Sequence, residues 1–595
     1  MKLGKKFTEW TCFKICFKAC PFITIYTILN TLILCIIPLV NIFATAKFIN
    51  ASVAVVTGGN SMKTVIWPIV LVVFATGYTY LEKSVTAIIW LKLESALRKE
   101  YGLMQIKKIA SLKYMYIENP KTLDLIRRIT NDEINKDGVV IKDICQGILS
   151  AIVILSQILA VFITIMSASE ITGLMILVIS IPLFFISMKA GKVRYDMESD
   201  VTKYKRQYEY INNIESNREA ADERSLFEYS SIMEKKWYES YEEFRKRSVW
   251  AKVKNNLHLE GGSVITSLLT IIIAALLLVS YYQNKITIGL FLSIFAAVMS
   301  LIETMSWSFT GTISSITNNH QYLKDVDEFF KLSEEDGALD EAGSKVLLNT
   351  IEFKNVRFRY PGTDYYVLNG LSMKLESGKH YAFVGSNGAG KTTVIKLITG
   401  LYREYEGDIY LNGKELRQYA LHELKSMFSI VYQDYAKYQV AMYDNIQFGN
   451  MNCTEGDINS AIESAGLQKV IQRMKKGLET PLGRILEDGQ DLSGGEWQRI
   501  AIARSLVNNN AIQILDEPTA ALDPIMENKV YEEFSRVSKG RTTIFISHRL
   551  GSTKLADIIY VIDSGKVAEY GTHESLMLKG QIYEKMYTSQ RKWYE

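Results

Sequence analysis

The sequence is poor in cysteine and close to charge balance, and both features argue against certain classes of protein. Only six of the 595 residues are cysteines, and no two of them form a C-x-x-C pair. This spacing suggests neither a zinc site nor a disulfide framework. The 68 basic and 64 acidic residues leave a net charge of only +4, so nothing in the overall charge favours nucleic-acid binding.

A secretory cleavage site is also missing. Residues 1–20 place several lysines among aromatic residues and cysteines, which predicts an amphipathic helix at the cytoplasmic surface of a membrane. No small-residue cleavage site follows, and the next apolar run, 21–48, is long enough to span a bilayer, so we do not interpret this segment as a signal peptide. Cys12, Cys16 and Cys20 share one face of the predicted helix. A packed or membrane-facing surface is our interpretation, with metal or redox chemistry as the alternative.

Apolar residues make up 48% of the chain, whereas charged residues make up only 22%. The apolar residues are concentrated in the first half, which predicts a membrane-embedded part followed by a soluble part. Six membrane spans are predicted, at residues 21–48, 64–92, 140–166, 171–190, 262–282 and 287–315. The fold class that we expect is therefore a helical membrane domain of six transmembrane helices joined to an α/β domain.

Two stretches between the predicted spans, 93–138 and 191–255, are dense in lysine and arginine. The positive-inside rule places them in the cytoplasm together with both termini. Their apolar residues recur at helical spacing, which predicts long cytoplasmic extensions of the membrane helices. Polar breaks at Tyr116–Pro120 and near Ala220–Arg224 predict short connecting helices that dock on a cytoplasmic domain.

The second half of the chain contains a phosphate-binding motif, G-x-x-x-x-G-K-T. It lies between an apolar strand-like run at 381–384 and a helix-like run at 393–398. Glycines let backbone N–H groups approach phosphates, Lys391 supplies a cation, and the Thr392 hydroxyl suits Mg²⁺. The expected ligands are ATP and Mg²⁺. The candidate residues of this loop are Gly385, Ser386, Asn387, Gly388, Ala389, Gly390, Lys391, Thr392 and Thr393.

From Ile351 onward, short apolar runs alternate with helical patterns, which predicts an α/β domain with a mainly parallel sheet. Ser493-Gly494-Gly495 forms a second glycine turn that opens a helix and can present N–H groups to a phosphate. A buried strand ends at Asp516 and Glu517, which suit a Mg²⁺ site and the polarisation of an attacking water. Another strand ends at His548. Ligands of such sheets bind beyond the carboxyl ends of the strands.

The order and spacing of these motifs resemble an ABC transporter. Residues 351–595 are similar to its nucleotide-binding domain and residues 1–325 to the exporter-type membrane domain, with a linker at 326–350. The resemblance implies that Tyr360 stacks on adenine and that Gln433 meets Mg²⁺ and water. It also implies roles for Ser493 and Gly495 as signature residues, for Asp523, and for His548 as the residue that contacts the γ-phosphate.

The segment Gly483–Asp488 departs from the family pattern, because it does not contain the usual Val-Gly-Glu motif. In the family, the signature loop of one copy faces the phosphate loop of a second copy. The expected unit is therefore a homodimer, with a heterodimer as the alternative. Glu517 and His548 are both present, which argues for hydrolysis in this copy.

The resemblance implies ATP-driven export across the bacterial cytoplasmic membrane by alternating access, with the ATPase domain in the cytoplasm. The amino-acid sequences of the motifs are similar to those of exporters of modified peptides, so the expected cargo is a peptide or a small amphipathic molecule. No leader-cleaving domain precedes the first span, so we expect another protein to remove any leader. Multidrug efflux, lipid flipping and an ATP-gated channel or sensor are the alternatives.

Among the charged residues inside predicted spans, we single out Glu82 and Lys83 in the second span and Glu303 in the sixth. Charges at membrane depth are costly, which makes these residues candidates for the substrate cavity. The alternative is an intramembrane ion pair or a side chain that reaches the inner membrane surface. If the three residues line the cavity, the cargo is polar or charged.

Overall fold

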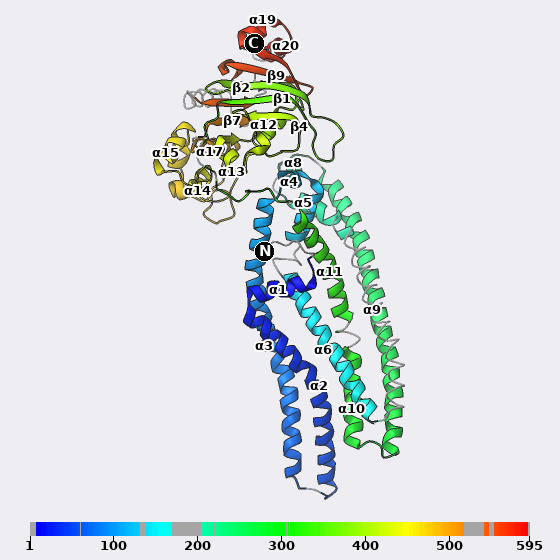
Figure 1. Cartoon of the computed structure of the whole chain (residues 1–595). Coiled ribbons are helices and arrows are strands. Elements are labelled where there is room, and N and C mark those ends of the chain that lie inside the picture. Colours follow the sequence, from blue (N-terminus) through cyan, green and yellow to red (C-terminus); the bar gives the residue numbers. More distant parts are fainter. Residues whose placement is uncertain are drawn as a thin grey trace. The chain divides into compact units, whose positions relative to one another are not determined.

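In the computed structural model the chain folds into two compact units (Figure 1). The first comprises Met1–Ile106 and Lys121–Leu332, and the second Lys107–Pro120 and Ser333–Glu595. The described residues are all except 1–6, 60, 131–138, 169–203, 206, 218–220, 228, 305–307, 309, 342, 344–345, 509, 517–540, 547–551 and 593–595. Some helical residues, among them Glu303, are described only by their backbone.

The described part of the first unit is helical. Its helices are α1 (Glu9–Ala19), α2 (Pro21–Val56), α3 (Lys63–Ser111), α5 (Pro120–Thr130), α6 (Val139–Ala168), α8 (Ala221–Leu226), α9 (Ser230–Tyr282), α10 (Ile288–Glu303) and α11 (Thr310–Lys331). Helix α3 has 49 residues and α9 has 53. At about 1.5 Å per residue they are about 74 and 80 Å long, more than twice the thickness of a hydrocarbon core. The predicted long extensions are therefore present.

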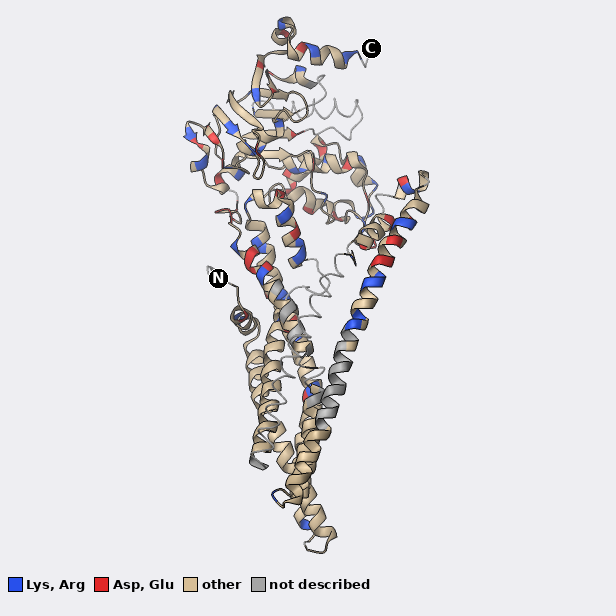
Figure 2. Cartoon of the chain, turned by 90° about the vertical axis from the view of Figure 1, so that its right-hand side faces the viewer, with Lys and Arg blue, Asp and Glu red and all other residues tan. Residues whose placement is uncertain are grey.

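Among the described residues, three helices are long and apolar enough to cross a membrane, and they contain the first three predicted spans: α2, α3 and the Val139–Met166 part of α6. Shorter apolar stretches, Ile271–Tyr282 and Ile288–Leu301, lie where the fifth and sixth spans are predicted. The fourth predicted span, 171–190, lies outside the described residues. In α9 the Lys, Arg, Asp and Glu residues gather toward the Ser230 end, while the apolar stretch is at the other end (Figure 2).

Helices α2 and α10 pack closely because a glycine stands at their contact. A Cβ atom on Gly289 would lie 2.2 Å from the Ala46 carbonyl oxygen. The Gly289 backbone N–H donates to Asn50 Oδ1 at 2.9 Å, and Asn50 Nδ2 donates to Thr287 Oγ1 at 2.9 Å. Absence of a side chain therefore allows both backbone approach and a polar link between two membrane helices.

The amino-terminal helix α1 packs on the first unit through its cysteine face. Cys12 and Cys16 are buried, and the Cys16 Sγ atom lies 3.6 Å from Cys145 Sγ of α6. Burial raises the pKa of the Cys12 thiol well above its usual range, which disfavours the reactive thiolate. These contacts agree with the interpretation of the cysteine face as a packed surface.

The second unit contains two sheets, in the orders β2-β1-β4-β5 and β10-β9-β3-β8-β7-β6. The strands of the first are β1 (Thr350–Phe358), β2 (Leu368–Glu376), β4 (Glu406–Leu411) and β5 (Lys414–Glu415). Those of the second are β3 (His380–Val384), β6 (Phe428–Val431), β7 (Ile512–Asp516), β8 (Thr542–Ile546), β9 (Ile558–Asp563) and β10 (Lys566–Gly571). All neighbours in the second sheet are parallel except β9 and β10. The predicted α/β domain is confirmed.

The helices of this unit lie before, between and after its strands in the sequence. They are α4 (Tyr114–Glu118), α12 (Lys391–Ile398), α13 (Leu421–Met427), α14 (Met442–Gln447), α15 (Glu455–Ser464), α16 (Gln468–Gln472), α17 (Gly494–Leu506), α19 (His573–Lys579) and α20 (Ile582–Arg591). Strand β3 is buried on both faces: Ala382 and Val384 pack in one core with α17, whereas Tyr381 and Phe383 pack in another with α12 and the antiparallel sheet. This explains why the strands of the larger sheet are continuous apolar runs.

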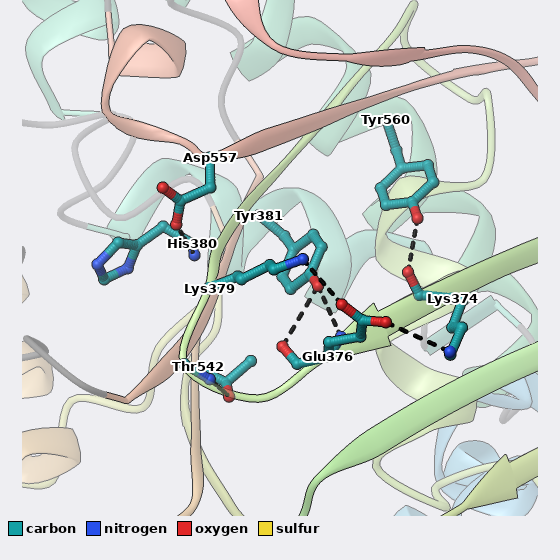
Figure 3. A network of polar contacts seen from close by, with 9 residues as sticks. Lys374, Glu376, Lys379, His380, Tyr381, Thr542, Asp557 and Tyr560 are labelled. Carbon is teal, nitrogen blue, oxygen red and sulfur yellow. Dashed lines mark hydrogen bonds and ion pairs between the residues drawn. The ribbon is translucent and has the colours of Figure 1, made fainter.

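A polar network holds the turn between β2 and β3, at the end of β3 away from the phosphate loop (Figure 3). Glu376 pairs with Lys379 at 2.8 Å and with Lys374 at 3.3 Å. The Tyr381 hydroxyl accepts from the Glu376 backbone N–H at 2.6 Å, and the His380 N–H donates to the Asp557 carboxylate at 2.7 Å. These contacts fix the start of β3, which in turn positions the loop at its other end.

Candidate functional site

The phosphate loop leaves the carboxyl end of β3 and enters α12, as its sequence predicts. A Cβ atom on Gly385 would lie 2.1 Å from the Ile562 carbonyl oxygen, so only glycine fits there. Gly390 has φ 104°, a conformation that side chains rarely adopt, and is the N-cap of α12. The loop is thus a close backbone turn that ends at a helix N-terminus, where partial positive charge favours a bound phosphate.

Lys391 is the first residue of α12, and its side chain bends back over the loop. The Lys391 ammonium donates to the carbonyl oxygens of Gly385 at 2.9 Å and Ser386 at 2.8 Å. The residue is only 5% exposed. A buried cation is thereby held against the backbone of the loop, where it can also meet a nucleotide phosphate.

The loop borders a cavity of about 480 Å³ with an aromatic wall. The Tyr360 hydroxyl and Thr393 Oγ1 form a hydrogen bond of 2.9 Å, which ties the aromatic residue to α12. The lining comprises Tyr360, Tyr365, Val367, Asn387, Gly388, Gly390, Lys391, Thr392, Thr393 and Gln433. One cavity therefore combines aromatic side chains, loop amides and an ammonium group. It can accept both a base and phosphates.

The signature segment opens α17 with reciprocal hydrogen bonds. The Ser493 side chain accepts from the Glu496 backbone N–H at 3.3 Å, and Glu496 Oε2 accepts from the Ser493 N–H at 3.0 Å. Burial alone would raise the pKa of Glu496, but the Ser493 N–H and the Arg473 guanidinium outweigh it and lower the pKa. Ser493 and Gly494 are exposed. The helix N-terminus is therefore preformed and open to a ligand from outside this chain.

Several predicted residues lie at the carboxyl edge of the larger sheet. Asp516 ends β7 and is only 1% exposed, while Gln433 follows β6, the neighbour of β7. Glu517, Asp523 and His548 lie outside the described residues. The structure thus brings Tyr360, the phosphate loop and Gln433 to one cavity, and it places Asp516 and Ser493 on separate elements of the same unit.

Helix α4 docks on the ATPase unit through a cluster of side chains around Glu118. The Glu118 carboxylate accepts hydrogen bonds from the Lys396 ammonium and from the Tyr402 hydroxyl. Tyr402 meets the rings of Tyr114 and Tyr360 edge to face, each with centroids 5.6 Å apart. The Lys396 ammonium lies 5.4 Å from the centre of the Tyr360 ring. The cluster therefore joins α4 to the aromatic wall of the cavity.

Glu118 and Lys396 each stabilise the ionised form of the other. Burial acts against the ionised form of Glu118, but the hydrogen bonds from Lys396 and Tyr402 outweigh it and lower the pKa of the carboxyl. Burial likewise acts to lower the pKa of Lys396, and the hydrogen bond to Glu118 reverses this and raises it. Both groups are therefore held charged at neutral pH. The docking of this predicted connecting helix is confirmed, but sequence reasoning did not identify Lys396, Tyr402 or Tyr365.

A second cavity, of about 760 Å³, lies within the membrane unit. It is lined by parts of α2, α3 and α6, including Glu82 and Lys83, and by Thr304, Ser308, Gly311, Thr312 and Ser315. The side chain of the third candidate, Glu303, lies outside the described residues. Two of the three candidate residues for the substrate cavity, Glu82 and Lys83, thus border one cavity.

Comparison with known proteins identifies relatives of both units. Residues 368–520 match the family model of the ABC transporter. The chain is 29% identical over 560 residues to the subtilin transport ATP-binding protein SpaT of Bacillus subtilis, covering 93% of this chain and 89% of that protein. It is 26% identical over 573 residues to the nisin transport ATP-binding protein NisT of Lactococcus lactis, covering 95% and 93%.

Two further matches cover less of the chain or have a lower sequence identity. The ATP-dependent lipid A-core flippase of Haemophilus ducreyi is 30% identical over 357 residues, which cover 57% of this chain and 60% of that protein. A solved bacterial Atm1-family ABC exporter with ATP bound superposes with a TM-score of 0.78 at 21% identity, covering 95% of this chain and 98% of that one. The fold thus extends over both units.

Proposed function

We propose that the chain exports a peptide across the bacterial cytoplasmic membrane. Its residues 368–520 match the ABC transporter family, and its fold is that of an ABC exporter, in which a multi-pass membrane domain and an ATPase domain share one polypeptide. Export is coupled to ATP hydrolysis and proceeds by alternating access. The proposed unit is a homodimer, with both termini and the ATPase domains in the cytoplasm.

One observation supports a peptide cargo above the alternatives. The relatives matched over nine-tenths of this chain are named for the transport of subtilin and nisin, both of them peptides. The lipid A-core flippase matches only 57% of the chain. Since the cargo is bound by the membrane domain, similarity that extends through that domain is the more informative. Lipid flipping remains the second candidate, on the strength of the flippase match.

The residues of the nucleotide site fit ATP with Mg²⁺. Lys391 and the amides of the loop would hold the β- and γ-phosphates, and Tyr360 would stack on the adenine. The Thr392 hydroxyl, the Gln433 amide and the Asp516 carboxylate supply oxygen donors, the ligands that Mg²⁺ prefers. When bound, Mg²⁺ neutralises charge on the phosphates.

Hydrolysis is assigned to residues beyond the carboxyl ends of β7 and β8. Glu517 would polarise the attacking water, His548 would contact the γ-phosphate, and Asp523 would complete the site. Ser493, Gly494 and Gly495 would bind the nucleotide held by the partner copy, in line with the exposed N-terminus of α17. In the membrane domain, Glu82, Lys83 and Glu303 are proposed to contact the cargo.

The test is the ATPase activity of the full chain in lipid nanodiscs, with a peptide, a drug and a lipid added in turn. We expect stimulation by peptides, and loss of at least about 100-fold of the activity in Glu517→Gln, because the general base becomes an amide. Glu463→Gln is the matched control, since Glu463 is an exposed carboxylate of α15. Stimulation by the lipid alone would favour flipping, and an absence of stimulation by any cargo would contradict the coupled pump.

A further inference from the structure

The membrane cavity contains a carboxylate that its neighbours hold in place. Glu82 of α3 accepts hydrogen bonds from Asn30 Nδ2 at 2.8 Å and from Thr86 Oγ1 at 2.7 Å, both at Oε1. The Tyr78 hydroxyl donates to Asn30 Oδ1 at 2.6 Å, which fixes the orientation of the Asn30 amide. Asn30 is 5% exposed. Three neutral side chains thus position one oxygen of Glu82.

The position of Glu82 in the membrane follows from its partner. Asn30 lies nine residues after the start of the membrane helix α2, or about 14 Å along it. The Glu82 carboxylate is at the same level, because it contacts Asn30 directly. An ionised carboxylate at this depth is costly unless an opposite charge meets it.

The described part of the membrane unit supplies no such charge to Glu82. Its hydrogen bonds come from neutral groups, and no described lysine or arginine lies within ion-pair distance of it. Asp143, the other acidic residue of the cavity lining, pairs with Lys142 at 3.3 Å. Lys83 also lines the cavity but is exposed and makes no ion pair with the described residues. Both hydrogen bonds to Glu82 end at Oε1, so within the described residues its other oxygen, Oε2, is available to a ligand.

We propose that Glu82 recognises a positively charged group of the cargo, the ammonium of a lysine or the guanidinium of an arginine. This inference rests on the proposed peptide export and adds a cationic cargo to it. A charge-assisted hydrogen bond to the second carboxylate oxygen would neutralise the Glu82 carboxylate, and such a bond is stronger where water is scarce. Asn30 and Tyr78 act as positioning residues, because they orient Glu82 and leave the ligand to it.

The experiment uses the full chain in nanodiscs of zwitterionic lipid, so that the membrane surface does not itself attract cations. The probes are two synthetic amphipathic peptides of equal length, one with four lysines and one with four glutamines at the same positions. We compare the peptide concentration that gives half-maximal stimulation of the wild-type ATPase. We expect this concentration to be at least about tenfold lower for the lysine peptide than for the glutamine peptide, as one charged hydrogen bond predicts.

The variants separate recognition from folding. Glu82→Gln should remove the preference for the lysine peptide, whereas Glu82→Asp should retain part of it because the charge remains. Glu100→Gln is the matched control: Glu100 lies on the same helix α3, outside the cavity lining, and pairs with Lys18 at 3.4 Å. The Glu100→Gln variant should prefer the lysine peptide as strongly as the wild type does.

The outcomes distinguish the two proposals. Equal stimulation of the wild type by both peptides would overturn the role of Glu82 and leave peptide export standing. A preference that survives in Glu82→Gln would also overturn it. Stimulation by neither peptide, with stimulation by a lipid, would contradict the proposed peptide export itself.

Discussion

Replacing Glu118 by glutamine should loosen helix α4 from the ATPase domain. The carboxylate accepts hydrogen bonds from Lys396, Tyr402 and Tyr114, and the side chain is 32% exposed. A hydrogen bond to a charged group contributes about 1.5–3 kcal/mol, whereas an exposed ion pair contributes about 0–1 kcal/mol. For this partly exposed cluster we expect a loss of about 1–2 kcal/mol in the docking of α4.

The loss should be visible in two measurements. A change of about 1–2 kcal/mol shifts the docking equilibrium by about 5- to 30-fold. Hydrogen exchange of the α4 amides should therefore become faster by a factor of that order. Cargo-stimulated ATPase should fall relative to basal ATPase, because α4 directly follows the membrane helix α3 in the chain. The Michaelis constant for ATP should also change, since Lys396 and Tyr402 both contact Tyr360.

The matched control is Glu404→Gln. Glu404 pairs with Lys113 of the same segment at 3.5 Å, but its side chain is 73% exposed, so water screens this pair almost fully. The control variant should resemble the wild type in both measurements. If the two variants cannot be told apart, the Glu118 cluster is only a surface contact and the reasoning is wrong.

The pH dependence of the Glu118 contact has a definite sign. Its pKa is lowered in the folded protein, so its contribution is present above the unfolded-state pKa of about 4.3. That contribution is lost only as the pH falls through the lowered value. The difference between wild type and Glu118→Gln should therefore stay constant from pH 6 to pH 8.

Two further predictions concern stability. Gly289→Ala should destabilise the membrane domain by about 1–3 kcal/mol, because its Cβ atom would overlap the Ala46 carbonyl oxygen at 2.2 Å. Thermal unfolding measures the loss. The control is Gly77→Ala, where a Cβ atom meets nothing within 4 Å and the unfolding temperature should stay close to that of the wild type. Burial and the Lys554 ammonium lower the pKa of His573, so the stability that its neutral form gives α19 and α20 should be present above about pH 6.5 and lost as the pH falls below it. Hydrogen exchange of these helices at several pH values measures the loss, and His573→Asn should abolish the pH dependence.

The phosphate loop could be predicted from sequence because its requirements are local. Gly385 and Gly390 are dictated by the space and backbone angles of a few neighbouring residues, and such constraints appear as fixed spacing. The long helices were predictable for a similar reason, since apolar runs and charge density vary along one chain. Of the sixth predicted span, 287–315, the structure describes α10 and the first residues of α11, and the residues 305–307 and 309 between them lie outside the described residues.

Contacts between distant segments could not be predicted in this way. Glu118 lies 278 residues from Lys396 and 284 residues from Tyr402, and no periodicity connects positions so far apart. The polar break at 116–120 indicated a docking helix but could not name its partners. A lysine and a tyrosine that follow a phosphate loop are unremarkable residues until the fold brings a carboxylate to them.

Glu82 shows how far a charge in an apolar run can be interpreted before a structure is known. Its depth alone allowed a substrate role, an intramembrane ion pair or a side chain that reaches the membrane surface. Its hydrogen bonds to Asn30 and Thr86 hold it at its own level of the helix, which argues against the last of these. The second alternative, an intramembrane ion pair, is not supported, because no described lysine or arginine pairs with Glu82. A carboxylate oriented by neutral donors, and bordering a cavity, is costly in the empty protein and becomes favourable when a cation enters. That difference between empty and loaded states is the free energy that a selective cavity can use to recognise its cargo.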